Sequence, residues 1–148
     1  MTTNTVRLHR VLRCPPDRIY RAFTEAAAYE CWLPPFGFMA KVHSMDAKVG
    51  GTYKMSFTNF GSGHAHSFGG KYLELVPGQR VVYEASFDDA NLPGTMKTTV
   101  TLTQVSCGTD MQVVQEGIPA VIPAEMCYLG WQESLVKLAQ LVEPQIPD

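Results

Sequence analysis

Long hydrophobic runs are absent from this sequence of 148 residues. A helix that crosses a bilayer needs about 20 consecutive, mainly apolar residues. The longest uninterrupted apolar run here is only a few residues long, and residues 1–7 lack the charged-then-apolar order of a signal peptide. We therefore expect no membrane span and a cytoplasmic location.

An excess of positive charge is also absent. The chain has 12 Lys and Arg residues against 14 Asp and Glu residues, and its formal net charge is −2 at pH 7. Proteins that bind nucleic acid neutralise phosphates with clustered Lys and Arg side chains. Because no such basic patch is available, the composition argues against nucleic acid as a partner.

Cysteine and histidine do not occur in the patterns of a metal site. The four cysteines, at positions 14, 31, 107 and 127, form no C-x-x-C pair, whereas zinc ligands recur at short, regular spacings. Cytosolic thiols of this kind stay reduced and pack as small hydrophobic side chains. His64 and His66 would share one face of a strand, but no third ligand stands at a telling spacing. We expect a solvated hairpin end there, no metal and no other cofactor.

Motifs for nucleophilic or phosphate chemistry are missing as well. The sequence has no G-x-S-x-G elbow, no Walker loop and no G-x-G-x-x-G turn. Glu84 and Glu116 fall on the outward phase of their strands, and Asp46 precedes a turn. None of them is a persuasive general base, so we assign no catalytic residue.

The first third of the chain predicts one strand and two short helices. Residues 4–13 roughly alternate between apolar and polar, which is typical of a half-exposed strand near a sheet edge. The helices are expected at 17–24 and 26–32, and Pro34-Pro35 ends the second. The length and the apolar fraction of 45% suit a single domain spanning residues 1–148.

From about residue 39 the apolar pattern changes to a period of two. This period predicts about six strands joined by hairpins, at 38–49, 53–58, 64–76, 81–87, 96–103 and 111–116. Gly69-Gly70 lies inside one of them, where interior glycines favour a bulge or bend that curls a sheet. Clustered strands followed by a helix predict an α+β fold with an antiparallel sheet.

The longest expected helix covers residues 122–142 and is followed by Pro144. Its apolar positions recur mostly at spacings of three and four: Met126, Leu129, Leu135, Leu138, Leu141 and Val142. Gly130-Trp131 in its middle permits two interpretations. A helix that roofs a cavity needs a gap beside an indole, but a glycine also allows close packing of a helix on a strand.

The inward phase of the strands is rich in methionine and aromatic residues. Such side chains make an adaptable lining for an apolar pocket and are also ordinary core residues. The aromatic loop 32–38 must turn inward or meet a ligand or partner, because loops normally avoid so much apolar surface. The candidate ligand-binding residues are Trp32, Phe36, Phe38, Tyr53, Met55, Phe57, Phe68, Tyr72, Tyr83, Phe87, Met96, Thr98, Met111, Gln115, Met126, Trp131 and Leu135.

An ordered set of short motifs resembles one protein family over about residues 6–142. The motifs are the helix opening Pro15–Thr24, Trp32 with Pro35–Phe38, the turn Met45–Tyr53, the paired segments Gly70–Pro77 and Arg80–Tyr83, Glu116-Gly117, and Gly130-Trp131 with Leu135. They are similar to the bacterial domain related to the C-terminal domain of the activator of the ninety-kilodalton heat-shock protein's ATPase. That domain belongs to the START-like (SRPBCC, birch-pollen-allergen-like) superfamily.

The resemblance implies a helix-grip fold, in which a curved antiparallel sheet of about six to seven strands wraps on the C-terminal helix around a cavity. It also implies small apolar ligands, such as lipids or aromatic polyketides, and a link to the stress response. Gln115 departs from the family pattern, because many relatives have a histidine just before the Glu-Gly pair. A neutral amide there lowers the expectation of acid–base chemistry.

Three functions remain open from the sequence. The first is a protein that binds a small hydrophobic or aromatic molecule between sheet and helix, with its mouth at loop 32–38. The second is a protein-interaction module, either a homodimer or a partner of a chaperone. The third is a cyclase- or hydrolase-type enzyme that uses the same cavity, although fold resemblance alone decides no chemistry.

Overall fold

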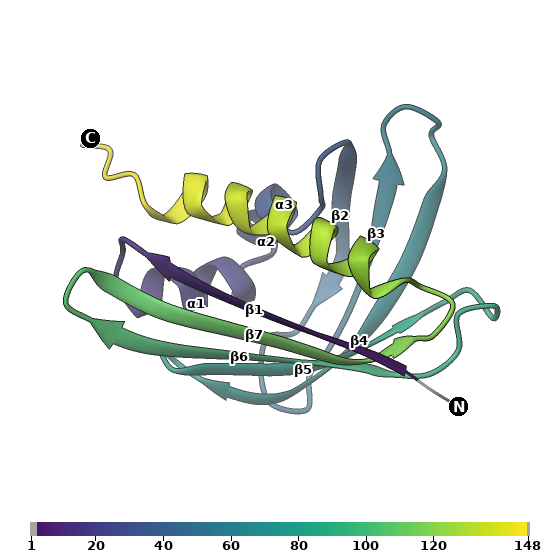
Figure 1. The fold of residues 1–148 in the computed structure, drawn as a ribbon, viewed down its shortest axis with the longest axis horizontal. Coiled ribbons are helices and arrows are strands. Elements are labelled where there is room, and N and C mark those ends of the chain that lie inside the picture. The colour runs from purple at the N-terminus through teal and green to yellow at the C-terminus, as the bar shows by residue number, and fades with distance from the viewer. Residues whose placement is uncertain (1–2, 148) are drawn as a thin grey trace.

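The computed structural model describes residues 3–147 and has three helices around one antiparallel sheet (Figure 1). The elements are β1 (Thr3–Leu12), α1 (Pro16–Thr24), α2 (Ala26–Trp32), β2 (Phe38–Met45), β3 (Thr52–Asn59), β4 (Ala65–Val76), β5 (Arg80–Phe87), β6 (Met96–Val105), β7 (Gly108–Pro119) and α3 (Ala124–Val142). The predicted α+β fold, the two short helices and the long closing helix are therefore confirmed.

The seven strands follow the spatial order β1-β7-β6-β5-β4-β3-β2. Hairpins connect β2 through β7 in sequence, whereas β1 pairs with β7, so the first strand lies beside the last strand. The alternating burial of β1, with Val6 and Leu8 inside, confirms the strand near a sheet edge. The expected bounds of two strands are wrong: β2 ends at Met45, with residues 46–51 as a connecting loop, and β7 extends beyond the expected 111–116 at both ends.

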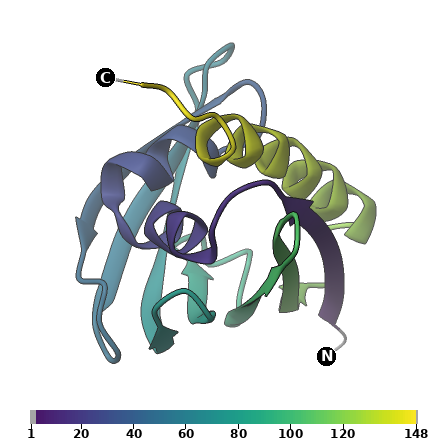
Figure 2. The ribbon, with the colours of Figure 1, turned by 90° about the vertical axis from the view of Figure 1, so that its left-hand side faces the viewer.

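The sheet curls into a trough, and α3 lies across its open side (Figure 2). Gly70 allows one of the close contacts in the curled sheet, because a Cβ there would lie 1.9 Å from the carbonyl oxygen of Glu84. The pairing of β4 with β5 shifts register between Tyr72 and Glu74, which marks an irregularity two residues later. The interior glycines thus permit a close approach of neighbouring strands, while the register irregularity lies at Tyr72 and Glu74 rather than at the glycines.

Helix α3 buries only half of the predicted apolar stripe, namely Leu135, Leu138 and Val142. Its buried residues are Trp131, Ser134, Leu135, Leu138 and Val142. Met126 and Leu129 are 66% and 58% exposed, and Leu141 is also exposed, so the prediction that these three residues face the sheet is wrong. The buried residues recur at spacings of three and four, so they form one face of the helix, and Trp131 belongs to that face.

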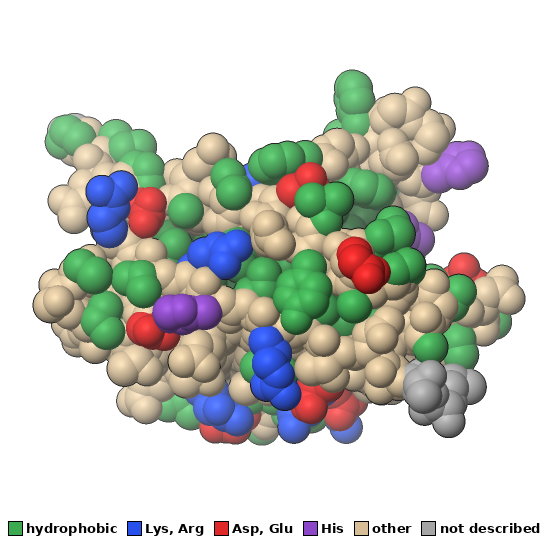
Figure 3. Space-filling view, in the orientation of Figure 1, with side chains coloured by type: hydrophobic (Ala, Val, Ile, Leu, Met, Phe, Trp, Pro, Cys, Tyr) green, Lys and Arg blue, Asp and Glu red, His purple; other side chains and the backbone are tan. Residues whose placement is uncertain are grey.

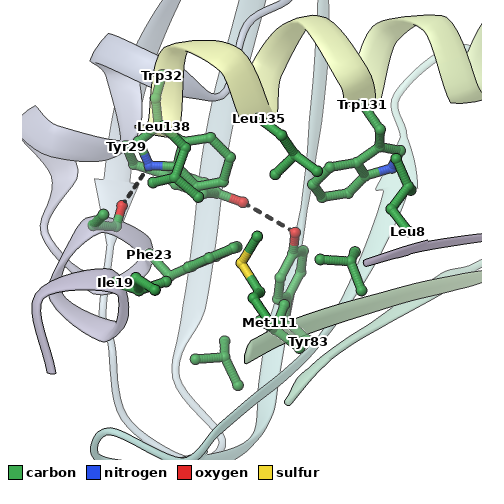
Figure 4. Packing of buried hydrophobic residues seen from close by; sticks show 14 of the residues in the cluster. Leu8, Ile19, Phe23, Tyr29, Trp32, Tyr83, Met111, Trp131, Leu135 and Leu138 are labelled. Carbon is green, nitrogen blue, oxygen red and sulfur yellow. Dashed lines mark hydrogen bonds between the residues drawn. The ribbon is translucent and has the colours of Figure 1, made fainter. Parts of the chain in front are cut away.

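Helices α1 and α2 cover one end of the trough (Figure 2), where their buried side chains pack against one another (Figure 4). The rings of Phe23 and Trp32 pack edge to face with centroids 4.7 Å apart, and Tyr29 lies 5.5 Å from Trp32. The indole Nε1–H of Trp32 donates to the carbonyl oxygen of Ala22 at 2.8 Å. Trp32 is 0% exposed, so its polar atom is satisfied inside the protein.

None of the helices within residues 3–147 combines the length and the apolar character that crossing a bilayer would require.

Candidate functional site

A cavity of about 230 Å³ lies between the sheet and α3. Its walls come from the end of α2, from the inner faces of β3 to β7, and from the first half of α3. The lining residues are Tyr29, Leu33, Pro35, Tyr53, Phe57, His66, Phe68, Tyr83, Ala85, Phe87, Met96, Gln115, Ile118, Ile122, Cys127, Gly130, Trp131 and Ser134. A pocket of this composition is mostly apolar, with a few polar groups that could orient a small molecule.

The wall contributed by α3 has a gap at its centre. Cys127, Gly130, Trp131 and Ser134 line the cavity and follow the three- and four-residue spacing of one helix face. A Cβ placed on Gly130 would meet no atom within 4 Å. The interpretation of Gly130 as a point of close helix-to-strand packing is therefore wrong, and the glycine leaves open space beside the indole.

A hydrogen bond between Trp131 and Gln115 orients the side-chain amide of Gln115 at the cavity wall. The Nε1–H of Trp131 donates to Oε1 of Gln115 at 2.9 Å. An indole N–H can only donate, so the bonded atom of the amide must be its oxygen. The amide NH₂ of Gln115 is left without a hydrogen bond to any of residues 3–147.

A pair of tyrosines forms the second polar group. The hydroxyl of Tyr29 donates to the hydroxyl of Tyr83 at 3.2 Å, as the dashed line in Figure 4 shows. Burial raises the pKa of both phenols, and the bond to Tyr29 partly opposes this rise at Tyr83. Both side chains therefore stay neutral and keep their protons at physiological pH.

Strand register aligns the polar side chains in one row across the sheet. Thr98 of β6 pairs with Tyr83 of β5 on one side and with Gln115 of β7 on the other. Thr98 is 1% exposed and does not line the cavity. Its Oγ1 is the one buried side-chain oxygen or nitrogen of residues 3–147 that has no hydrogen-bond partner.

His66 and three phenylalanines form an aromatic rim on the β3–β5 side. The imidazole centroid lies 5.9 Å from the ring of Phe57, 6.4 Å from Phe68 and 6.2 Å from Phe87. The imidazole is partly desolvated among these rings, which lowers the pKa of His66. The rim is therefore apolar and uncharged at neutral pH.

No Asp, Glu, Lys or Arg from residues 3–147 lines the cavity. The titratable lining groups with shifted pKa values all move towards their neutral forms: burial raises the pKa of the tyrosines and of Cys127, and lowers that of His66. Over the same residues, no three His, Cys, Asp or Glu side chains are grouped closely enough to hold a metal ion. The arrangement can desolvate an apolar molecule and offer hydrogen bonds, but it offers no carboxylate.

Comparison with known families adds a match over most of the chain. The family described as "Activator of Hsp90 ATPase homolog 1-like protein" matches residues 13–143. The chain belongs to this AHSA1-like family. A search of curated proteins found no match.

Solved structures from bacteria share the fold of this AHSA1-like chain. A crystal structure of a Chromobacterium violaceum protein is 62% identical, covers 96% of this chain and 99% of its own, and superposes with a TM-score of 0.95. A Rhizobium loti protein is 26% identical, covers 95% and 98% of the two chains, and has a TM-score of 0.78. An AHSA1-like protein from Aeromonas hydrophila is 15% identical with a TM-score of 0.76, over 95% and 92% of the two chains, and this likeness shows the fold alone.

The AHSA1-like structure brings some of the predicted site residues to the cavity and places others elsewhere. Those at the cavity are Tyr53, Phe57, Phe68, Tyr83, Phe87, Met96, Gln115 and Trp131. Met55, Tyr72, Thr98, Met111 and Leu135 are buried but do not line it. Trp32 is sealed in the solid end, Phe36 is exposed, and Phe38 packs beside Phe57 and His66 without lining the cavity. The inward placement of Met126 is wrong, because the side chain points to solvent.

Sequence reasoning missed several lining residues, of which Tyr29 and His66 matter most. His66 was expected at a solvated hairpin end, and the residue is indeed exposed, but it also lines the cavity, because it shares the inward phase of β4 with Phe68 and pairs with Phe57. That phase could have identified it. Tyr29 and Leu33 also line the cavity at a spacing of four, which is one face of a helix. The end of β7 contributes Ile118 and the link to α3 contributes Ile122, neither of which was among the predicted site residues.

Proposed function

We propose that this AHSA1-like protein binds a small apolar or aromatic molecule in the cavity between the sheet and α3. The observation that carries the proposal is the open, uncharged space beside Gly130 and Trp131. A cavity lined by Tyr, Phe and Met side chains buries apolar ligand surface, and each 100 Å² removed from water contributes about 2.5 kcal/mol. The Trp131–Gln115 bond holds the indole in place before a ligand arrives.

Binding is favoured over catalysis by the groups around the cavity. A cyclase or hydrolase would need an acid or base with a pKa near the working pH. Among residues 3–147 no carboxylate lines the cavity, and its phenols hold their protons more tightly than usual. The remaining candidate is His66, which lies at the rim rather than beside the Tyr29–Tyr83 pair.

The first test joins native mass spectrometry with tryptophan fluorescence. The mass of the purified protein would reveal a molecule that co-purifies, and titration with planar aromatics and fatty acids would measure saturable binding. Trp131 lines the cavity whereas Trp32 is fully buried elsewhere. We expect Trp131→Phe to remove the ligand-dependent change and Trp32→Phe to retain it; a change that depends on Trp32 would contradict the proposal.

Filling the gap at Gly130 gives a second test. Gly130→Leu places a branched side chain in open space, so we expect at least about a 10-fold loss of affinity without loss of folding. Gly130→Ala is the matched control, because one methyl group occupies little of the cavity and we expect it to bind nearly as the wild type does. Equal affinity of the leucine variant and the wild type would place the ligand elsewhere.

The second candidate function is a protein-interaction module, and one observation favours it. Met126, Leu129 and Val136 expose apolar surface along the outer side of α3, where Figure 3 shows hydrophobic side chains gathered. Exposed apolar patches can mark contact sites between proteins. A native mass that corresponds to a dimer, and that Leu129→Glu returns to the monomer, would favour this function. A monomeric mass at all concentrations would count against the dimer.

A further inference from the structure

We infer that the cavity selects uncharged carbonyl compounds, whose oxygen accepts a hydrogen bond from the amide NH₂ of Gln115. This inference rests on the proposed binding function and narrows its ligand class. It excludes carboxylates such as fatty acids and favours ketones, aldehydes, esters or quinones carried on an apolar body.

The first step is the absence of charge. A carboxylate that enters this cavity would leave water without meeting a Lys or Arg side chain, because none from residues 3–147 lines it. Removing an unpaired ion from water is strongly unfavourable, even after the protein relaxes. His66 cannot replace a fixed cation, because partial burial lowers the pKa of its imidazole. A ligand that stays neutral avoids this penalty.

The second step concerns which hydrogen-bonding atoms are free. Trp131 occupies the carbonyl oxygen of Gln115, so the amide turns its NH₂ away from the indole. The Tyr29–Tyr83 pair uses one of its two protons in its own hydrogen bond, and Thr98 beside Tyr83 can accept the other, so the free donor is the amide NH₂ of Gln115. Gln115 and Tyr83 both line the cavity and lie on either side of Thr98 in the strand register. The polar wall therefore offers a donor, and a ligand oxygen that accepts complements it.

The third step is size. A dry apolar cavity of about 150 Å³ holds one benzene molecule in another protein. The cavity here, at about 230 Å³, suits a body of about two fused rings rather than a long alkyl chain. Aromatic side chains on β3, β4 and β5 would pack against such a body, because Phe57, Phe68 and Phe87 line one side.

Three probes of nearly the same shape separate the possibilities. We would measure the affinity of 2-acetylnaphthalene, 2-ethylnaphthalene and 2-naphthoate by calorimetry at pH 7.5. We expect the ketone to bind about 3- to 10-fold more tightly than the hydrocarbon, which is the range for one neutral hydrogen bond. We expect the carboxylate to bind at least about 30-fold more weakly than the ketone.

Gln115 variants test the donor directly. Gln115→Glu keeps an oxygen to accept from Trp131 but loses the NH₂, and Gln115→Met approximates the volume without either polar group. We expect both variants to abolish the advantage of the ketone over the hydrocarbon while the hydrocarbon still binds to Gln115→Met. The infrared carbonyl band of bound ¹³C-labelled ketone should lie at lower frequency in the wild type than in Gln115→Met. Thermal unfolding would verify that each variant folds.

The outcomes distinguish this inference from the binding function. If ketone and hydrocarbon bind equally to the wild type, or if the carboxylate binds best, the carbonyl preference is overturned and a binding cavity remains. If Gln115→Met still binds the ketone more tightly than the hydrocarbon, and the carbonyl band of the bound ketone has the same frequency as in the wild type, Gln115 is not the donor. If none of the three probes binds, both the inference and the proposed function fail.

Discussion

The two ends of the interior are built from similar residues but packed differently. At the end covered by α1 and α2, Trp32 packs edge to face against both Phe23 and Tyr29, and both Phe23 and Trp32 are almost completely buried (Figure 4). At the end covered by the first half of α3, Trp131 stands beside Gly130 and a cavity of about 230 Å³ remains. The number of aromatic residues therefore does not decide whether an interior is solid.

The covering helices account for the difference. Helices α1 and α2 fill the trough with the large side chains of Ile19, Phe23 and Trp32, all nearly or fully buried. The cavity face of α3 has small side chains on either side of one large ring, namely Cys127, Gly130 and Ser134 around Trp131. A row of small residues cannot fill the space that a curled sheet leaves, so the hollow follows from side-chain volume.

The largest expected contrast between the two ends is in stability. Phe23→Ala should lower the free energy of unfolding by about 3–5 kcal/mol, because it leaves a cavity in close-packed surroundings. Phe87→Ala should cost less than about half as much, since that ring is only half-buried and already faces open space. Urea unfolding of both variants checks the comparison, and equal losses would show that the cavity end is as tightly packed as the other.

A smaller contrast separates two positions on α3. Gly130→Ala should raise the free energy of unfolding by about 0.5–1 kcal/mol, because alanine favours the helix and its Cβ meets nothing. Ala139→Gly, towards the solid end of the same helix, should lower it by about 1 kcal/mol or more. Thermal unfolding monitored by circular dichroism measures both. A destabilised Gly130→Ala variant would mean that the gap is filled in solution.

The rim of the cavity should respond to pH, whereas the solid end should not. The lowered pKa of His66 means that the unfolded chain binds this proton more readily than the folded one. Above the pKa of an unfolded histidine, about 6.5, His66 has no effect on the free energy of unfolding. As the pH falls from there to the lower pKa of the folded protein, protonation of His66 reduces that free energy. In His66→Gln, the loss of stability between pH 7 and pH 5 should be smaller than in the wild type. Unfolding curves at the two pH values test this difference, and NMR titration of His66 would reveal an ordinary pKa if the prediction is wrong.

The smallest expected effect concerns the polar row beneath the cavity. Thr98→Val removes a buried hydroxyl that has no hydrogen-bond partner among residues 3–147 and keeps the side-chain shape. We expect a change within about 1 kcal/mol, in the stabilising direction, because no hydrogen bond is lost. Denaturant unfolding measures it, with Thr109→Val as the contrasting control, since Thr109 Oγ1 donates to the carbonyl oxygen of Cys14 at 2.7 Å. Equal losses would show that Thr98 has a partner after all.

The order of elements could be predicted because it depends on local patterns. Alternation in β5 and β6 and the helical spacing in residues 16–32 are properties of short segments. The buried face of α3 could not be assigned, because Met126, Leu129 and Leu141 are as apolar as the residues that are buried. Which of two apolar stripes meets the sheet depends on how the helix lies on the trough, and that is a tertiary property.

The candidate site was predictable only along the strands. The period of two placed Tyr83 and Gln115 on the cavity face, whereas the gap at Gly130 was one of two interpretations that the sequence left open. Met111 shares the inward phase of β7 with Gln115 but is buried away from the cavity, and Met55 on β3 is buried between two lining residues, Tyr53 and Phe57. Phase alone therefore does not separate the cavity lining from the core, because the packing around each side chain also decides which of them meets open space.

The pairing of β1 with β7 has a consequence for how the chain is synthesised. Val6 aligns with Gln115, so the first strand waits for a partner more than 100 residues downstream. Until β7 leaves the ribosome, β1 has no neighbour in the sheet, and the trough has no roof until α3 follows. Such distant pairing slows folding and prolongs the exposure of unpaired strands. We therefore expect the nascent chain to be more prone to aggregation during translation than a protein whose paired strands are adjacent in sequence.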